Sequence, residues 1–165
     1  MQSLLRLLLI GFAGLALTAP VASQRADDQI LPKSLGLQRQ ARELVSAGKL
    51  DQAEDLLETA LVADPRNRSA LVDIARVAGK QHLFGKAIRT TNKALQLEPN
   101  DPDAIAVQGE AMVELGATAR AQANLQKLQT ICGAKGCPQI AQLSQAITRG
   151  PTVASAKAPE TPKSN

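Results

Sequence analysis

The amino-acid sequence predicts an all-α fold, a short α–α superhelix of about three helical hairpins followed by a C-terminal capping helix. A composition dominated by good helix formers and an internal repeat together support this prediction. Ala, Leu, Gln, Glu, Lys and Arg prevail among the 165 residues, and aromatic residues make up only 1%. Sandwiches and barrels draw on aromatic and β-branched residues, so an all-β fold is not expected.

The repeat has a period of 34 residues. Several independent columns share this offset: Asp64-Pro65 with Glu98-Pro99, Ala53 with Ala87 and Ala121, Ala60 with Ala94, and Ala41 with Ala75 and Gly109. One coincidence means little in an alanine-rich chain, whereas several columns at one offset indicate a repeated structural unit. A unit of this length cannot bury its apolar face alone, so neighbouring units are expected to stack.

Each unit has the pattern of two helices joined by a short turn. In the first unit, Leu37 and Leu44 lie on one face of a helix, and Gly48 follows where a positive φ is often needed. Asp51 then opens the second helix, and Pro65 stops it because proline cannot continue a helix interior.

The N-terminal residues have the order of a secretory signal peptide. Arg6 supplies a positive charge, residues 7–17 form an uncharged apolar core, and small residues follow up to Ser23, after which cleavage is expected. The protein is therefore expected to be periplasmic or secreted. The apolar run is shorter than the roughly 20 residues that span a bilayer, and retention as an uncleaved anchor is the alternative.

The remaining boundaries follow from caps and from one apolar stripe. Asn67 and Asp101 are good N-caps for the helices that open the second and third units. Ile140, Leu143 and Ile147 form a stripe that predicts a helix covering the last unit. The expected organisation is a signal peptide at 1–23, a linker at 24–33, units at 34–67, 68–101 and 102–135, a capping helix at 136–149 and a disordered tail at 150–165.

The repeat resembles that of the tetratricopeptide-repeat family, whose unit has the same length, small residues at three inner positions and a proline near its end. Ala41, Ala53, Ala60 and Pro65 occupy those positions in the first unit. The third unit has Gly133 instead of the proline. Smaller side chains fill the family's aromatic positions, and a histidine replaces one turn glycine: the residues concerned are Leu37, Leu44, Leu57, Ala78, Thr91 and His82.

The resemblance implies that the first helix of each unit lines a concave groove that binds a peptide or protein partner. The groove would be basic in its first two units and acidic in the third, which predicts a partner segment with the opposite charge order. An ordinary solvated face is the alternative. The residues expected in the groove are Gln38, Arg42, Val45, Val72, Arg76, Lys80, Ala106, Glu110 and Glu114.

The resemblance also bears on the class of partner. Some family members grip a C-terminal carboxylate with a lysine and asparagine clamp, but Arg42, Arg76 and Glu110 occupy the asparagine column here. A role as a chaperone-tail receptor is therefore not expected. The expected function is that of a periplasmic scaffold or adaptor in envelope assembly, secretion or pilus biogenesis, acting as a monomer or weak oligomer.

Other function classes find little support in the sequence. The net charge of +4 comes without a basic run or an aromatic stacking platform, which argues against nucleic-acid binding. His82 is the single histidine, and neither a Ser–His–Asp constellation nor a four-ligand zinc site can be assembled around it. No enzymatic activity, cofactor or metal is therefore expected.

Cys132 and Cys137 flank a short loop between the last repeat helix and the predicted capping helix. In an exported protein they are expected to form a structural disulfide. The alternative function is that of a thiol-redox accessory protein, because Cys137 precedes a helix N-terminus that would lower the pKa of its thiol. The four residues between the two cysteines, rather than two, favour the structural role.

Overall fold

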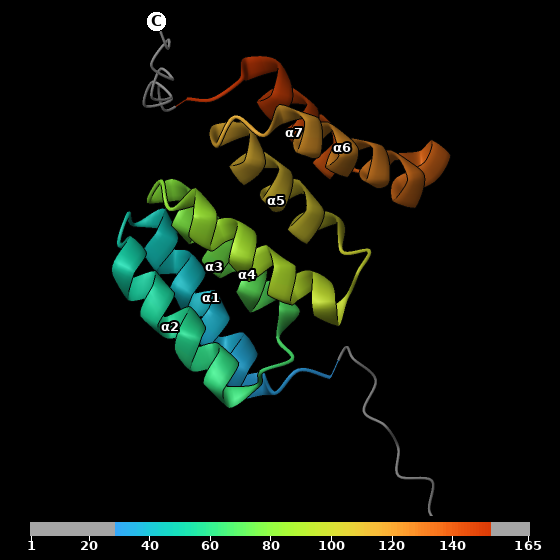
Figure 1. Ribbon diagram of the computed structural model, residues 1–165. Helices are drawn as coiled ribbons and strands as arrows, with labels where there is room; N and C mark the ends of the chain where they lie inside the picture. The colour runs from blue at the N-terminus through green and yellow to red at the C-terminus, as the bar shows by residue number, and fades with distance from the viewer. Residues whose placement is uncertain (1–28, 153–165) are drawn as a thin grey trace, which may run out of the picture.

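The computed structural model describes residues 29–152 and shows antiparallel helix pairs stacked side by side, with one further helix at the end (Figure 1). The predicted signal peptide at 1–23 and positions 153–165 of the predicted tail lie outside the described residues. None of the described helices is long and apolar enough to span a bilayer. The helices are α1 (Pro32–Ser46), α2 (Leu50–Ala63), α3 (Arg68–Lys80), α4 (Phe84–Leu97), α5 (Pro102–Glu114), α6 (Thr118–Cys132) and α7 (Pro138–Arg149), with a 3₁₀ turn at Gly133–Lys135.

The predicted all-α fold is confirmed, because residues 29–152 contain helices and no strand. Helix pairs α1–α2, α3–α4 and α5–α6 correspond to the three repeat units. The helix α1 begins at Pro32, before the expected start of the first unit, because proline is well tolerated at a first helical position.

The observed helix N-caps agree in part with those expected from the sequence. Asn67 and Asp101 accept hydrogen bonds from the backbone N–H groups of Ala70 and Ala104, which confirms both as N-caps. Asp51 lies within the first turn of α2 rather than at its N-cap, where its charge still interacts favourably with the helix dipole.

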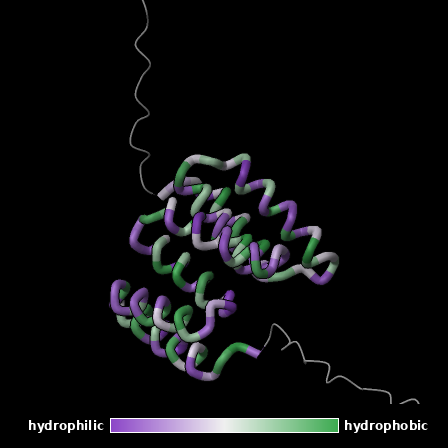
Figure 2. The backbone as a smooth tube through the Cα atoms, turned by 60° about the horizontal axis from the view of Figure 1, so that its bottom comes forward, coloured by the Kyte–Doolittle hydropathy of each residue, from purple (hydrophilic) through white to green (hydrophobic). Residues whose placement is uncertain are grey.

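The core consists of small side chains that allow close helix packing. Ala41, Ala53 and Ala60 are fully buried between α1 and α2, and the corresponding alanines repeat this arrangement in the second unit. Figure 2 shows hydrophobic and hydrophilic residues alternating along the helices, as expected for helices that bury one face.

The turns inside the three hairpins adopt the same left-handed backbone conformation. Gly48 and Gly116 have φ values of 74° and 72°, and His82 has a φ of 59° at the equivalent position. This conformation costs a non-glycine residue free energy because its Cβ crowds the backbone. The histidine ring packs edge-on against Phe84, with ring centroids 5.8 Å apart, which offsets part of the cost.

Replacing His82 with glycine is therefore expected to raise the free energy of unfolding by about 1 kcal/mol, because the strain of the left-handed conformation exceeds the lost ring contact. Urea denaturation followed by circular dichroism measures the change. Gly116→Ala, the reverse change in the third hairpin, should cost a similar amount. A His82→Gly variant less stable than wild type would contradict the expectation.

The helix α7 covers the third unit by packing on both α5 and α6. Its Leu143 is fully buried and lies over Gly109 of α5. A Cβ at position 109 would come within 2.6 Å of a Leu143 methyl carbon, closer than side chains can approach. This contact explains why the column that holds Ala41 and Ala75 has glycine in the third unit.

The start of α1 is tied to the end of α2 through Asp64. The Leu31 backbone N–H donates a hydrogen bond to Asp64 Oδ2 at 3.0 Å, and the Arg66 side chain and backbone N–H also donate to this carboxylate. The Leu31 hydrogen bond, followed by the Arg66 side-chain bond, holds the pKa of Asp64 below its ordinary value.

A lowered pKa means that Asp64 stabilises the fold at pH values above its unfolded pKa of about 3.9 and that this contribution is lost as the pH falls through the lower folded value. We therefore expect the stability difference between wild type and Asp64→Asn to shrink as the pH is lowered from 6 to 2. Urea midpoints measured across this range provide the test. A difference that stays constant with pH would show that the charge of Asp64 contributes nothing.

Candidate functional site

Polar side chains join the inner helices α1, α3 and α5 in a continuous series, here called the polar ladder: Gln38, Arg42, Asp73, Arg76 and Asp103. Asp73 Oδ2 accepts hydrogen bonds from Gln38 Nε2 and Arg42 Nε, both at 2.7 Å. Arg76 donates to Asp73 at 3.1 Å and to Asp103 at 2.7 Å, so it bridges α3 and α5. The ladder thus links all three units through one face.

The polar ladder changes the charge expected for the groove. Arg42 and Arg76, predicted to make the first two units basic, are already paired with Asp73 and Asp103. Gln38 is buried and bonded to Asp73, so it holds α1 against α3 and offers little surface to a partner. The sequence did not indicate that either aspartate pairs with the groove arginines across units, although the i, i+3 spacing of Asp73 and Arg76 on one helix is compatible with the pair within α3.

The predicted apolar groove residues also lie deeper than expected. Val72 and Ala106 are buried, with 1% and 0% of their surface exposed, and Val45 is half-buried. Val72 contacts the core between the second and third units, and Ala106 belongs to the core under α7. Val72 and Ala106 therefore serve the packing of the stack and are not available as contact surface, whereas Val45 keeps part of its surface exposed.

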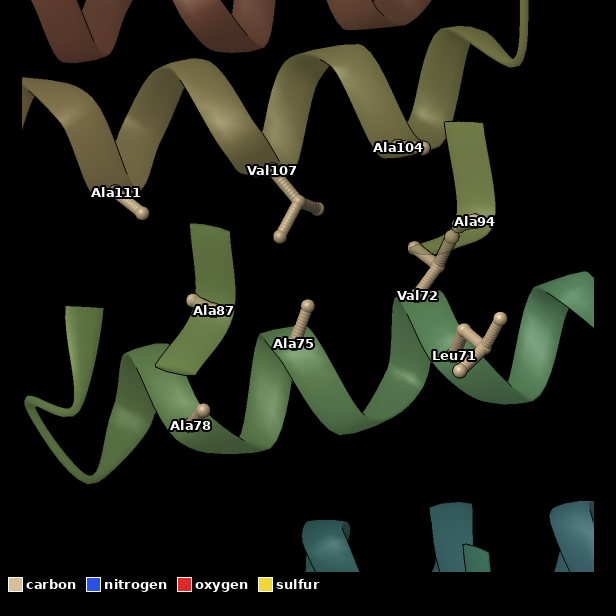
Figure 3. Packing of buried hydrophobic residues seen from close by; sticks show 9 residues of the cluster. All are labelled: Leu71, Val72, Ala75, Ala78, Ala87, Ala94, Ala104, Val107 and Ala111. Atoms are coloured by element: carbon tan, nitrogen blue, oxygen red, sulfur yellow. The ribbon is translucent and has the colours of Figure 1, made fainter. Parts of the chain in front are cut away.

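The other four predicted residues, Arg76, Lys80, Glu110 and Glu114, surround one recess of about 340 Å³. We call it the inner recess. Its floor comes from three helices and is apolar but almost fully buried: Ala75 of α3 and Ala87 of α4 have no exposed surface, and Val107 and Ala111 of α5 are each 4% exposed (Figure 3). Gly79 and Phe84 complete the wall on the side of the second unit, and Gln142 of α7 lies on the side of the third.

Two charged side chains at the inner recess have no ion-pair partner among residues 29–152. They are Lys80, which is exposed on α3, and Glu110, which is half-buried on α5. Glu114 differs, because it accepts hydrogen bonds from the Thr152 backbone N–H and hydroxyl and lies 3.8 Å from an Arg149 nitrogen. The recess therefore offers one cation, one carboxylate and a half-buried apolar wall, Gly79 and Phe84.

A larger hollow of about 450 Å³ lies between Ile30, the turn joining α2 to α3, and the end of α4. Both of its arginines have acidic partners: Arg66 is paired with Asp64 and Arg68 with Asp101. Its charges thus stabilise the seam between units, which makes the inner recess the better candidate for binding.

Cys132 ends α6 and Cys137 precedes α7, and their sulfur atoms lie at disulfide-bonding distance, with the Cα atoms 5.7 Å apart. Both residues are half-buried. The pair closes the short loop that leads into the capping helix, a position that favours the structural role over the thiol-redox alternative.

Replacing both cysteines with serine is expected to lower the free energy of unfolding by about 2 kcal/mol, the low end of the usual range, because the closed loop is short. Urea denaturation without reductant measures the difference. Reductant should shift the wild-type midpoint to that of the double variant and leave the double variant unchanged. Coinciding curves for the two oxidised proteins would exclude a stabilising bond.

Three stacked helix pairs with a recess on their inner helices define a short helical-repeat solenoid. No protein-family model and no curated protein sequence matches the chain. Solved structures match over most of the described residues. The three described next are 17–20% identical to this chain.

The Sgt2 TPR domain from Aspergillus fumigatus matches with a TM-score of 0.65 at 20% identity, over 72% of this chain and 78% of that one. The second TPR domain of human RPAP3, in complex with the HSP70 peptide SGPTIEEVD, matches with a TM-score of 0.61 at 19% identity, over 69% and 94%. The Yersinia enterocolitica type III secretion translocator chaperone SycD matches with a TM-score of 0.62 at 17% identity, over 71% and 87%. The chain therefore has the tetratricopeptide-repeat fold.

Proposed function

We propose that the protein is an exported adaptor that binds a segment of a partner protein at the inner recess. The observation that carries this proposal is a recess with a partly exposed apolar wall, Gly79 and Phe84, beside two charges, Lys80 and Glu110, that have no ion-pair partner among residues 29–152. Concave sites that combine an apolar lining with a few placed polar groups are the usual form of a binding site. The human RPAP3 domain of the same fold holds a peptide, which supports the assignment by analogy of fold.

Crosslinking in living cells tests the adaptor role. A photoreactive amino acid is placed at position 80 or 110, at the recess, or at position 122, an exposed glutamine on the outer helix α6. The two recess positions should capture the same protein, and position 122 should not. Equal capture from all three positions would refute binding at the inner recess.

The compartment is part of the proposal and has its own test. The signal-like residues 1–23 support export, and a partner in envelope assembly, secretion or pilus biogenesis is proposed by analogy with exported proteins of this fold. Fractionation of cells followed by mass spectrometry of the intact protein should find a periplasmic or secreted species that begins after Ser23. A cytoplasmic protein that retains residues 1–23 would contradict export.

A further inference from the structure

We propose that the inner recess receives one bulky apolar side chain of a peptide, whose neighbouring residues carry opposite charges. The acidic neighbour would contact Lys80 and the basic neighbour Glu110. This inference rests on the proposed function and specifies the chemistry of the partner.

The hollow exists because the second and third units carry small side chains where large ones would fill the space. Ala75, Ala87 and Ala111 line its floor, and Gly79 lines its wall. Ala78, at a column where the resembling family has an aromatic residue, belongs to the same cluster of buried residues. Figure 3 shows these alanines and Val107 on the facing sides of α3, α4 and α5, and Phe84 and Ile88 pack against the same cluster. The floor itself is covered, whereas Gly79 and the Phe84 ring in the wall stay partly exposed, and an apolar side chain that covers them would be stabilised.

The charges on the two walls restrict what can flank that side chain. Lys80 extends from α3 and Glu110 from α5, and neither forms an ion pair among the described residues. A segment of uniformly acidic residues would meet Glu110 and Glu114, and a uniformly basic one would meet Lys80 and Arg76. Opposite charges on the two sides of the anchor avoid both repulsions and complement both walls.

Gly79 provides a way to block the recess without disturbing the core. It lies in the last turn of α3, and a Cβ built on it meets no atom within 4 Å. A leucine at position 79 can therefore enter the hollow and compete with a ligand. Gly36 of α1 is a matched control, because it is also helical, also meets no atom within 4 Å and lies outside the inner recess.

The test uses an array of synthetic ten-residue peptides with a central Phe, Leu or Ala, flanked by Lys and Glu in both orders, and measures binding by fluorescence polarisation. Wild type and Gly36→Leu should bind Phe- or Leu-centred peptides of one charge order at least tenfold more tightly than the opposite order or Ala-centred peptides. Gly79→Leu should lose that binding at least tenfold, with an unchanged circular dichroism spectrum.

A charge exchange gives an independent readout on surface residues. The double variant Lys80→Glu with Glu110→Lys should bind the opposite charge order. Equal binding by Gly79→Leu and wild type, an unchanged order in the exchange variant, or no binding by any peptide of the array would each overturn the inference. If crosslinking from position 80 still captured a partner in cells, the adaptor role would stand and only the peptide chemistry would fall.

Discussion

Replacing Gly109 with leucine is expected to detach the capping helix and to lower the free energy of unfolding by about 3 kcal/mol, at the upper end of the range for overpacked cores. Even a methyl group at position 109 would come within 2.6 Å of a methyl carbon of Leu143, which is fully buried on the inner face of α7. The longer side chain can enter only if α7 moves away from α5. Urea denaturation measures the loss, and hydrogen exchange should locate it in residues 138–149.

The control for this prediction is Gly36→Leu, which makes the same substitution in a helix where a new side chain meets open space. It should be neutral or slightly stabilising, because leucine favours the helix more than glycine does. Unchanged protection of α7 from exchange in Gly109→Leu would show that the contact with Leu143 does not hold the capping helix.

The second large effect is expected at the centre of the polar ladder. Asp73→Ala should lower the free energy of unfolding by about 2–3 kcal/mol, because it leaves the buried Gln38 amide and two guanidinium groups without their shared acceptor. The cost stays below that of a fully buried ion pair, since the side chains of Arg42 and Arg76 are 57% and 38% exposed and can regain water.

Asp73→Asn separates the charge from the hydrogen bonds. Its amide oxygen can still accept from Gln38, so about half of the loss should be recovered. Urea denaturation at low and high salt distinguishes the two contributions, because salt screens the arginine pairs more than the buried amide bond. An Asp73→Ala variant as stable as wild type would mean that the polar ladder does not contribute to the free energy of unfolding.

The repeat architecture could be predicted from the sequence because it depends on local signals that recur. The alanine columns, the turn glycines and the N-caps Asn67 and Asp101 each act within one unit or between adjacent units, so their spacing carries the information. The glycine in the column of Ala41 and Ala75 is different. Its reason, the contact between Gly109 and Leu143, links segments that no periodicity relates.

The candidate site could be predicted only in part for a similar reason. A column rule selects a face of the first helix in each unit, and it did find Arg76, Lys80, Glu110 and Glu114 at one recess. It does not reveal which side chains on that face form ion pairs or hydrogen bonds with neighbouring units. Arg42 and Arg76 find Asp73 and Asp103 across the unit boundaries, and Gln38 becomes buried, because stacking brings positions about 30 residues apart into contact.

The capping helix also determines how copies of this molecule can associate. A stack of like units has two ends, and head-to-tail growth into a filament needs an apolar surface at both. At the C-terminal end, Leu143 and Ala146 of α7 face inward, whereas Gln145 and Thr148 face the solvent. At the N-terminal end, Leu31 and Leu35 of the first hairpin remain partly exposed. Because the solvent-facing side of α7 is polar, we expect head-to-tail stacking of copies to be disfavoured.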